Sequence, residues 1–480
     1  MNSLEMFEVD YLPLDDRPCN IDFPHWLSKA AGFKLLTASS PGEFSQHLEK
    51  SPSVLVSYDR WIYGGLLESR EKKISLEQAK SKLQKLEKLL SKKNKKRYGF
   101  NVLLRQAPSA FNVEEERLAA LIKQASMLDG DKVKQRAILA ELPKNAWNDY
   151  CFIRNRNFEI NKKTIDFAKK KALDCFVIGL DDLTSIGLNQ KERKALEGLI
   201  RQKKASSTVR ILPGADELGM LLLARMALDQ AKKHPRIFPV YSHPTSERFR
   251  LRYEDCSVQV LFKQQAELLK AKIVNREKDA DLLLFIHTPH EDQLDVPANP
   301  APVDLELWLD RLEKNVNAGK LCVLADLRYA NGADSHLMRS LPQRLPFFSL
   351  AGFSAWNTSA NALGVAFAQG AVRWVADATG TFTKEKRQAH EALLALRVYE
   401  DWFYQAEIRP GIIQRFKKEN RSRFSLRGEE ESQLSAEVKN KIQRALQLYF
   451  KADFERFPDF TVSFPWHRLF DIRFELRGAN

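Results

Sequence analysis

Two adjacent aspartates, Asp181 and Asp182, directly follow the apolar run CFVIGL at residues 175–180. Neighbouring carboxylates repel each other and are costly to remove from water, so a buried strand that ends on two of them needs an explanation. One explanation is catalysis, because close carboxylates can hold their pKa values apart, one donating a proton while the other stays ionised. A glycosidase needs this division of roles. A bound cation that neutralises both charges is the alternative.

Polar side chains also follow most of the other apolar runs. In parallel α/β folds, ligands bind at these carboxyl ends of the strands. Each alone has a structural explanation, such as a turn, a cap or a local ion pair. Together, acids and amides beside aromatic rings favour a polyhydroxylated ligand. Arg17 and Arg70 suit a carboxylate or phosphate group on that ligand. We predict that these residues bind the substrate, most of them in one cleft with Asp181 and Asp182: Asp15, Asp16, Arg17, Asp59, Tyr63, Arg70, Asp216, Glu217, Asn331, Asp334, Trp356, Asn357 and Asn361.

The sequence contains none of the motifs that mark other common chemistries. There is no GxSxG, no HExxH and no glycine-rich phosphate loop around Gly64 and Gly65. The five cysteines lack CxxC or Cys/His spacing. The aspartates could hold Mg²⁺, but their spacing does not demand it. We therefore expect no cofactor and assign no metal site.

Composition limits the partners and the compartment. The 480 residues are 44% hydrophobic, with a net charge of +14. The basic residues are dispersed and accompany no recognition motif, so we expect no nucleic-acid partner. No stretch of about 18 uncharged apolar residues occurs, and the first residues do not read as a secretory signal, so we expect no membrane partner. The scattered cysteines and the missing secretory signal predict a cytoplasmic protein. The polar strand ends predict a small-molecule or oligosaccharide substrate.

The elements that must position these residues alternate between strands and helices. Strands are predicted at residues 7–14, 33–38, 53–58, 99–106, 174–180, 208–214, 237–242, 281–288, 320–327 and 346–353. Most are continuous apolar runs, which is typical of parallel strands covered on both faces. Capping boxes at Ser75–Gln78 and Asn189–Glu192 mark two of the helices between them. The predicted class is α/β with a mostly parallel sheet, either TIM-barrel-like or doubly wound.

The chain is too long for one ordinary core. We predict an α/β domain at residues 1–235 with a helical insertion at 113–173. A second α/β segment at 236–380 completes the cleft, and a helical C-terminal region follows at 381–480 and ends on the strand-like FDIRFEL.

Several blocks of the sequence resemble the signature blocks of a bacterial family catalogued as domain of unknown function 4127. They are YLPLDDRPCN, YDRWIYGGLLESR, IGLDDLTSIGL, LPGADELGMLLLAR, ANGAD and WNTSANALG, with the closing FPWHRLFDIRFEL. The resemblance covers nearly the whole chain but implies little about function.

A second resemblance is to the substrate-assisted β-N-acetylglucosaminidases of the O-GlcNAcase type, which are TIM barrels. The strand ending in Asp-Asp and the later tryptophan–asparagine motif carry it. It implies that Asp181 polarises the substrate's acetamido group and that Asp182 is the general acid/base. The sequence departs from that pattern, because five predicted strands precede the pair where those enzymes have four.

Three functions remain open from the sequence. The leading hypothesis is an enzyme, a glycoside hydrolase or related sugar-processing enzyme, possibly acting on N-acetylhexosaminides. The alternatives are a divalent-metal-dependent hydrolase or isomerase that uses the same aspartates, and a sugar- or metabolite-binding protein without catalysis.

Overall fold

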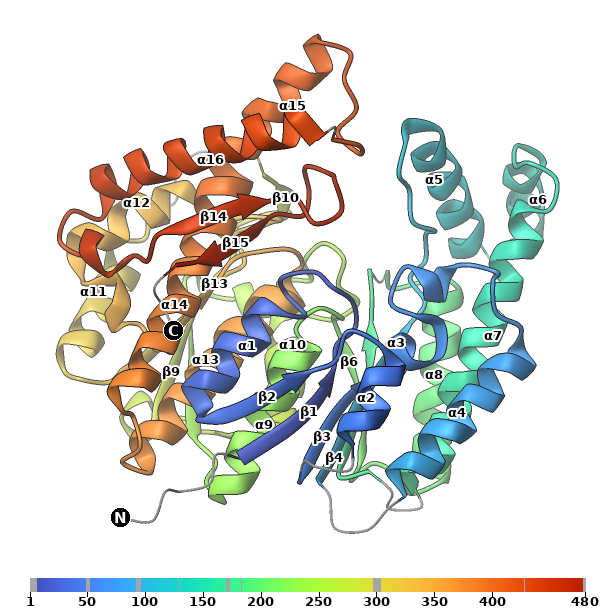
Figure 1. Ribbon diagram of the computed structural model, residues 1–480, viewed down its shortest axis with the longest axis horizontal. Helices are drawn as coiled ribbons and strands as arrows, with labels where there is room; N and C mark the ends of the chain where they lie inside the picture. The colour runs from blue at the N-terminus through green and yellow to red at the C-terminus, as the bar shows by residue number, and fades with distance from the viewer. Residues whose placement is uncertain are drawn as a thin grey trace. The chain divides into compact units, whose positions relative to one another are not determined.

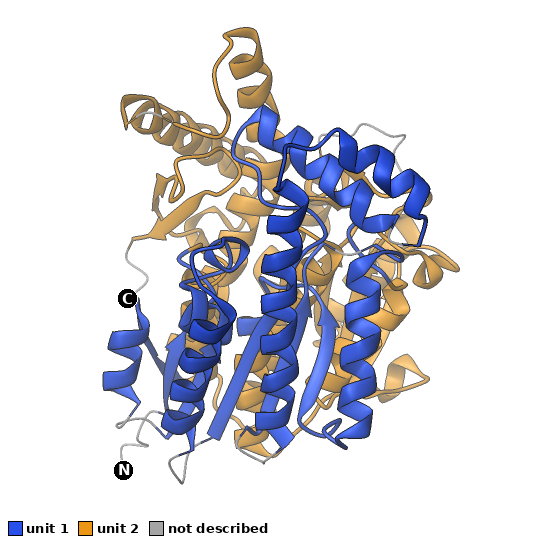
Figure 2. Cartoon of the chain, turned by 90° about the vertical axis from the view of Figure 1, so that its right-hand side faces the viewer, with its two compact units in different colours: residues 1–16, 33–219, 253–255 blue, residues 17–32, 220–252, 256–480 orange. Residues whose placement is uncertain are grey.

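The computed structural model describes residues 7–48, 52–91, 96–128, 130–169, 173–182, 184–296, 304–426 and 428–477 (Figure 1). The chain divides into two compact units (Figure 2). Unit 1 comprises residues 1–16, 33–219 and 253–255, and unit 2 comprises residues 17–32, 220–252 and 256–480. The chain therefore passes between the units several times, and each unit is built from segments that are distant in sequence.

Unit 1 is built on a six-stranded sheet whose neighbouring strands are all parallel. Its order is β2-β1-β3-β4-β5-β6. The strands are β1 (Phe7–Leu12), β2 (Phe33–Thr37), β3 (Ser53–Ser57), β4 (Lys96–Leu103), β5 (Cys175–Leu180) and β6 (Val209–Pro213). Every residue of β3 and β5 is buried, as continuous apolar runs require of a sheet that is covered on both faces. The order is that of a doubly wound fold, with the chain reversing direction between β1 and β3.

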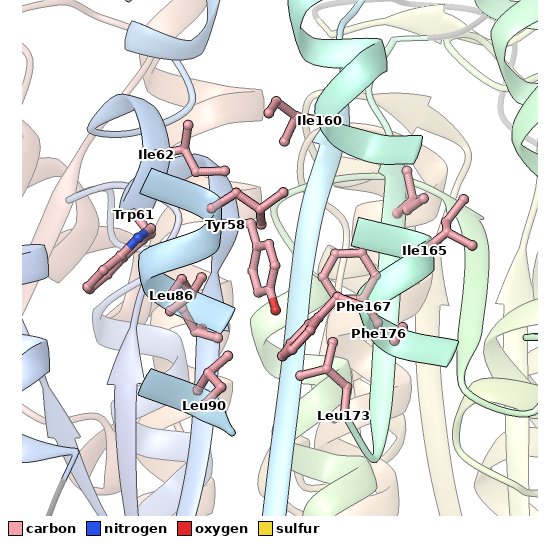
Figure 3. Close-up of a cluster of buried hydrophobic side chains, with 14 of the residues drawn as sticks. Tyr58, Trp61, Ile62, Leu86, Leu90, Ile160, Ile165, Phe167, Leu173 and Phe176 are labelled. Carbon is pink, nitrogen blue, oxygen red and sulfur yellow. The ribbon is translucent and has the colours of Figure 1, made fainter. Parts of the chain in front are cut away.

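Helices of unit 1 cover one face of this sheet with a large apolar core. They are α2 (Pro41–His47), α3 (Tyr58–Tyr63), α4 (Leu76–Leu90), α7 (Ala146–Phe167) and α8 (Leu188–Gln202). Helix α4 begins with the predicted capping box, and its buried residues Ala79, Leu83, Leu86 and Leu90 recur at helical spacing. Figure 3 shows side chains from α3, α4, α7 and β5 gathered in this core. Helices α5 (Val113–Met127) and α6 (Lys132–Ala140) precede α7.

Unit 2 repeats the same topology in a five-stranded parallel sheet, ordered β13-β11-β9-β7-β8. The strands are β7 (Arg236–Tyr241), β8 (Lys272–Ile273), β9 (Leu282–His287), β11 (Leu321–Asp326) and β13 (Gly352–Ser354). In both sheets the second strand of the chain lies outside the first, and the later strands follow on the other side. Both sheets are open in the described part of the chain, so the doubly wound alternative is correct and the barrel-like alternative is wrong.

Helices and short strands complete unit 2. The helices are α1 (Asp22–Ala31), most of α9 (Leu218–Ala231), α10 (Val258–Leu268), α11 (Glu306–Asn317), α12 (Ser335–Arg344), α13 (Ser359–Ala378), α14 (Lys384–Arg397), α15 (Arg409–Lys418) and α16 (Gly428–Tyr449). A π-helix, η6 (Val398–Ile408), continues α14. The short strands β10 (Leu294–Asp295) and β12 (Tyr329–Ala330) pair in parallel, and β14 (Phe460–Ser463) and β15 (Arg473–Leu476) pair in antiparallel fashion beside α16 (Figure 1).

The strand predicted at residues 346–353 is mostly wrong. The structure has a 3₁₀ turn, η5 (Phe347–Ser349), followed only at Gly352 by the three-residue strand β13. Phe347 and Phe348 are buried against Phe450 and Phe457, so an apolar run here serves a side-chain cluster instead of a sheet. Within the described residues, none of the helices combines the length and the apolar character needed to cross a lipid bilayer.

Candidate functional site

The two adjacent aspartates lie at the carboxyl end of β5, and each is bound by a different arginine of unit 1. Arg70, which ends the 3₁₀ helix η1 (Glu68–Arg70), donates a hydrogen bond to Asp181 and also to Ser109. Arg105, just beyond β4, forms an ion pair with Asp182. The side chains of Asp181 and Asp182 are 16% and 20% exposed, so a ligand can reach both carboxylates. The pair is therefore neither free in water nor sharing one cation.

Asp182 is further set apart by its backbone and by its surroundings. Its φ of 42° lies in the left-handed region, which is uncommon for a residue other than glycine. Burial raises the pKa of the Asp182 carboxyl, the nearby charge of Asp181 adds to this, and the charge of Arg105 opposes it. A carboxyl group in such surroundings can hold a proton that its neighbour has lost.

Asp59 forms a second buried carboxylate at the same edge of the sheet, one residue into α3. It is 3% exposed, and its Oδ2 accepts a hydrogen bond from the backbone N–H of Val102 at 2.7 Å. Burial raises the pKa of Asp59 to about 7, against the opposing effects of the Val102 hydrogen bond and of the Arg70 and Arg156 charges. Asp181 is close enough to add to the increase. This edge of the sheet therefore holds a second carboxyl group, besides Asp182, whose pKa burial raises.

Further acids follow β6. Glu217 is fully buried, and burial raises its pKa well above the usual range, with Asp216 and Glu254 adding to the effect. Its Oε2 accepts a hydrogen bond from the backbone N–H of Ala215. Arg105 is a cation close to these acids. Burial lowers the pKa of Arg105, but the nearby charges of Asp182, Asp181 and Asp216 raise it. A single arginine thus faces carboxylates from the ends of two strands.

A cavity of about 360 Å³ opens beside this edge in unit 1. Apolar side chains dominate its lining, among them Leu104, Leu118, Ile122 and Ile153, and the polar members are Arg70, Lys144, Asp149 and Tyr150. A mostly apolar cavity of this size with a few polar groups is typical of small-molecule sites. Arg70 links the cavity to the aspartate pair, because it both lines the cavity and binds Asp181.

The remaining predicted residues of unit 1 are placed less favourably for binding. Asp16 is exposed and forms an ion pair with Arg60 at 2.8 Å, at the reversal point between β1 and β3. Asp15 is buried at the same point. Tyr63 belongs to the apolar core, with the Arg156 guanidinium 4.5 Å from its ring centroid. Its ring is therefore not an exposed platform for a sugar.

The predicted residues of unit 2 form a separate set. Asn331 donates its backbone N–H to Asn357 O at 2.9 Å, and both residues have a φ of 67°, which asparagine tolerates better than most residues. Asp334 caps α12 and also lies 3.1 Å from His287 Nε2. Trp356 and Asn361 are buried, 2% and 1% exposed, with side-chain polar atoms that have no partner among the described residues. Arg17 lies against the Trp466 ring.

The structure thus gathers Asp59, Arg70, Asp181, Asp182, Asp216 and Glu217 on the carboxyl edge of the unit 1 sheet and holds Arg17, Asn331, Asp334, Trp356, Asn357 and Asn361 in unit 2. The single cleft that joins both sets stays a prediction. Sequence reasoning missed Arg105 as the partner of Asp182, although its place at the end of the predicted strand 99–106 was the available signal. Among the described residues, no group of three or more histidine, cysteine, aspartate and glutamate side chains is arranged to hold a metal ion.

Comparison with known proteins identifies the family but not an activity. The chain matches no curated protein and no solved structure. The resemblance to O-GlcNAcase-type enzymes is therefore not supported by these comparisons. A family model described as a protein of unknown function, DUF4127, matches residues 9–475. Because this match covers nearly all of the sequence, in agreement with the signature blocks, the chain belongs to the DUF4127 family.

Proposed function

We propose that this chain is a sugar-processing enzyme, a glycoside hydrolase, in which Asp182 is the general acid/base and Asp181 is the carboxylate that stabilises the developing positive charge. The proposal rests on one observation. Two adjacent, partly exposed carboxylates at a strand end are bound by two different arginines, Arg70 and Arg105. Two carboxyl groups with different surroundings are what acid–base cleavage of a glycosidic bond requires.

The surroundings favour this division of roles. Burial raises the pKa of Asp182, which favours the protonated form that a general acid needs. Asp181 accepts its hydrogen bond from the Arg70 guanidinium, a partner that suits an ionised carboxylate. The cavity that Arg70 lines would hold the apolar part of the leaving group, because its walls are mainly apolar side chains. Free cysteines throughout the chain agree with a cytoplasmic location.

A narrower version gives the substrate a 2-acetamido group, which Asp181 would polarise. The second candidate function is binding of a small metabolite without catalysis. The ion pairs of Asp181 with Arg70 and of Asp182 with Arg105 favour this second candidate. Carboxylates that already have cationic partners could serve only to hold the cavity walls in place. The two functions differ in what Asp182→Asn does, since a binding protein has no turnover to lose.

A panel of chromogenic glycosides, assayed with and without EDTA, tests the proposal. We expect turnover of at least one glycoside, unchanged by the chelator and lost in Asp182→Asn. Asp174→Asn is the matched control, because Asp174 precedes the same strand and its side chain is 37% exposed in an ion pair with Lys96. Turnover that needs a metal, or that Asp182→Asn leaves intact, would overturn the proposal. Equal activity on glucosides and N-acetylglucosaminides would reject only the acetamide version.

A further inference from the structure

A second cluster of polar residues lies at the carboxyl edge of the unit 2 sheet, apart from the carboxylates of unit 1. His243 follows β7, His290 follows β9 and Arg328 follows β11, and β9 lies between the other two strands. In this sheet the chain reverses direction between β7 and β9, because β8 lies on the far side of β7. The carboxyl ends of the strands at such a reversal point are where doubly wound sheets bind ligands.

Arg328 is the unusual member of this cluster. It is 6% exposed, and among the described residues no carboxylate pairs with its guanidinium at ion-pair distance. Its Nε is buried without a hydrogen-bond partner in the described part of the chain, and the guanidinium lies 5.5 Å from the Tyr329 ring centroid. A buried charge without an ion-pair partner among the described residues is unfavourable, so this arrangement favours the binding of an anionic group by Arg328.

The acids closest in sequence are already bound elsewhere. Asp326 accepts hydrogen bonds from the backbone N–H groups of Arg328 and Asp334. Asp334 accepts one from the backbone N–H of His336, and its Oδ2 lies 3.1 Å from His287 Nε2. These carboxylates are therefore bound by backbone donors and His287. Burial raises the pKa of Asp334, but the His287 hydrogen bond and the charges of His287 and Arg328 lower it, so Asp334 lies near Arg328 without forming an ion pair with it. The Arg328 side chain also faces other groups.

Those other groups include neutral histidines. The His243 and His290 ring centroids lie 3.3 Å apart, so the two imidazoles are in contact. Burial lowers the pKa of His243 to about 4, with the neighbouring His290, His287 and Arg328 adding to the decrease. The Nε2 atom of His243 is buried and has no hydrogen-bond partner among the residues that the structure describes. A neutral imidazole can donate one N–H to a ligand without bringing a second full charge beside Arg328.

The first turn of α13 adds further donors to this edge. Gln293 Nε2 donates to Leu327 O at 2.9 Å and to Ser359 Oγ at 3.1 Å, so the loop before Arg328 is tied to the start of α13. Within the described residues, Oδ1 and Nδ2 of the buried Asn361 in this turn have no hydrogen-bond partner, and neither has Trp356 Nε1 just before it. The N-terminus of a 20-residue helix adds partial positive charge.

We propose that Arg328 is the charged donor of an oxyanion site at the carboxyl edge of the unit 2 sheet, which binds a phosphate or carboxylate group. His243 and the start of α13 supply neutral donors to the same group. A planar guanidinium binds such oxyanions in a bidentate manner, and the anion would supply the ion-pair partner that the described residues do not give Arg328. The site does not depend on the aspartate pair of unit 1, so its test is independent of the test of the glycosidase proposal.

Thermal unfolding of the full chain in inorganic phosphate, acetate or chloride at matched ionic strength tests this site. We expect phosphate or acetate to raise the Tm above its value in chloride, because a ligand that binds only the folded state stabilises it. Arg328→Gln should abolish this increase and, in chloride, should unfold at the same or a higher temperature than the wild type. The matched control is Arg276→Gln, since Arg276 precedes the amino end of β9 and its side chain is 66% exposed in an ion pair with Asp279.

The pattern of responses separates the sources of the anion. An increase with phosphate alone indicates a phosphoryl group, and an increase with acetate alone indicates a carboxylate. No increase with either anion, or an equal increase in wild type and Arg328→Gln, would overturn the proposal. A strong loss of stability in Arg328→Gln in chloride would also overturn it, because that result would mean that the chain already neutralises the guanidinium.

Discussion

The Asp59 carboxylate accepts a hydrogen bond from the backbone N–H of Val102 at 2.7 Å and thereby joins the first turn of α3 to strand β4. The bond places an ionisable group where it is 3% exposed, and burial raises its pKa from 3.8 to about 7. The unfolded chain ionises Asp59 near pH 4, whereas the folded chain keeps the proton up to about pH 7. Folding therefore takes up a proton in this window, and the contribution of Asp59 to stability falls as the pH rises through it.

Asp59→Asn should remove this pH dependence. An asparagine oxygen can still accept from Val102, and the amide carries no charge to desolvate. We expect the variant to come close to the wild type near pH 4 and to gain on the order of 3–4 kcal/mol in free energy of unfolding at pH 8. Urea unfolding at the two pH values measures the difference. A gain of the same size at both pH values would contradict the assignment.

Activity and stability should separate at Asp182. Asp182→Asn removes the proposed general acid, so turnover should fall by roughly 10²–10⁴-fold. The lost ion pair with Arg105 lies between partly exposed side chains, so the stability cost should be only about 1 kcal/mol. Glycoside kinetics and urea unfolding of the same preparation measure both effects. A large loss of stability with a matching loss of activity would show that Asp182 has only a structural role.

Asp401 should be among the most sensitive positions of unit 2. It is fully buried in η6, pairs with the equally buried Arg397, and accepts hydrogen bonds from Ser354 Oγ and from the backbone N–H of Ala355. Asp401→Ala would leave Arg397 with fewer partners and remove the hydrogen bonds that hold the end of β13. We therefore expect the free energy of unfolding to fall by roughly 3–5 kcal/mol.

The control for this prediction lies on the same π-helix. Glu407 forms a partly exposed ion pair with Arg339, and Glu407→Ala should cost less than about 1 kcal/mol. Chemical unfolding of both variants decides the comparison. Similar losses for Asp401→Ala and Glu407→Ala would argue against a special role for the buried network.

Gly214 should not tolerate a side chain. Its φ is +101°, and a Cβ atom there would overlap the buried Glu217 carboxyl. Gly214→Ala should therefore destabilise unit 1 by about 1–3 kcal/mol. Gly198→Ala is the matched control, because Gly198 lies inside α8 with no atom within 4 Å of the added Cβ and should gain about 0.5–1 kcal/mol. Thermal unfolding distinguishes the two, and a stabilised Gly214→Ala would refute the packing argument.

Local sequence was a good guide wherever local rules sufficed. The run at residues 174–180 was predicted as a strand covered on both faces, and β5 is that strand, because continuous apolar residues fit a strand whose two faces are both buried. The same rule failed at residues 346–353, because an apolar run can equally be buried as a 3₁₀ turn against aromatic side chains distant in the chain.

The expected capping box at Asn189 and Glu192 shows where local rules stop. Helix α8 begins at Leu188 without a side-chain cap, and both residues instead accept hydrogen bonds from Arg154, a buried residue of α7. Leaving a buried guanidinium without hydrogen-bond acceptors costs more free energy than leaving a helix end uncapped, because water or the backbone can satisfy a helix end. The tertiary contact with Arg154 therefore formed in place of the capping box that the local sequence predicted.

The sequence by itself determined the parallel α/β class, the positions of the principal strands and the presence of acids at their ends, because side-chain periodicity and strand-end polarity act over a few residues. Only the tertiary structure decided that both sheets are open, that Arg70 and Arg105 bind the two aspartates, and that Arg328 is buried without an ion pair in the described residues. Those partners lie far apart in the sequence, and no spacing rule fixes such contacts. They depend on which surfaces the packed sheets and helices bring together.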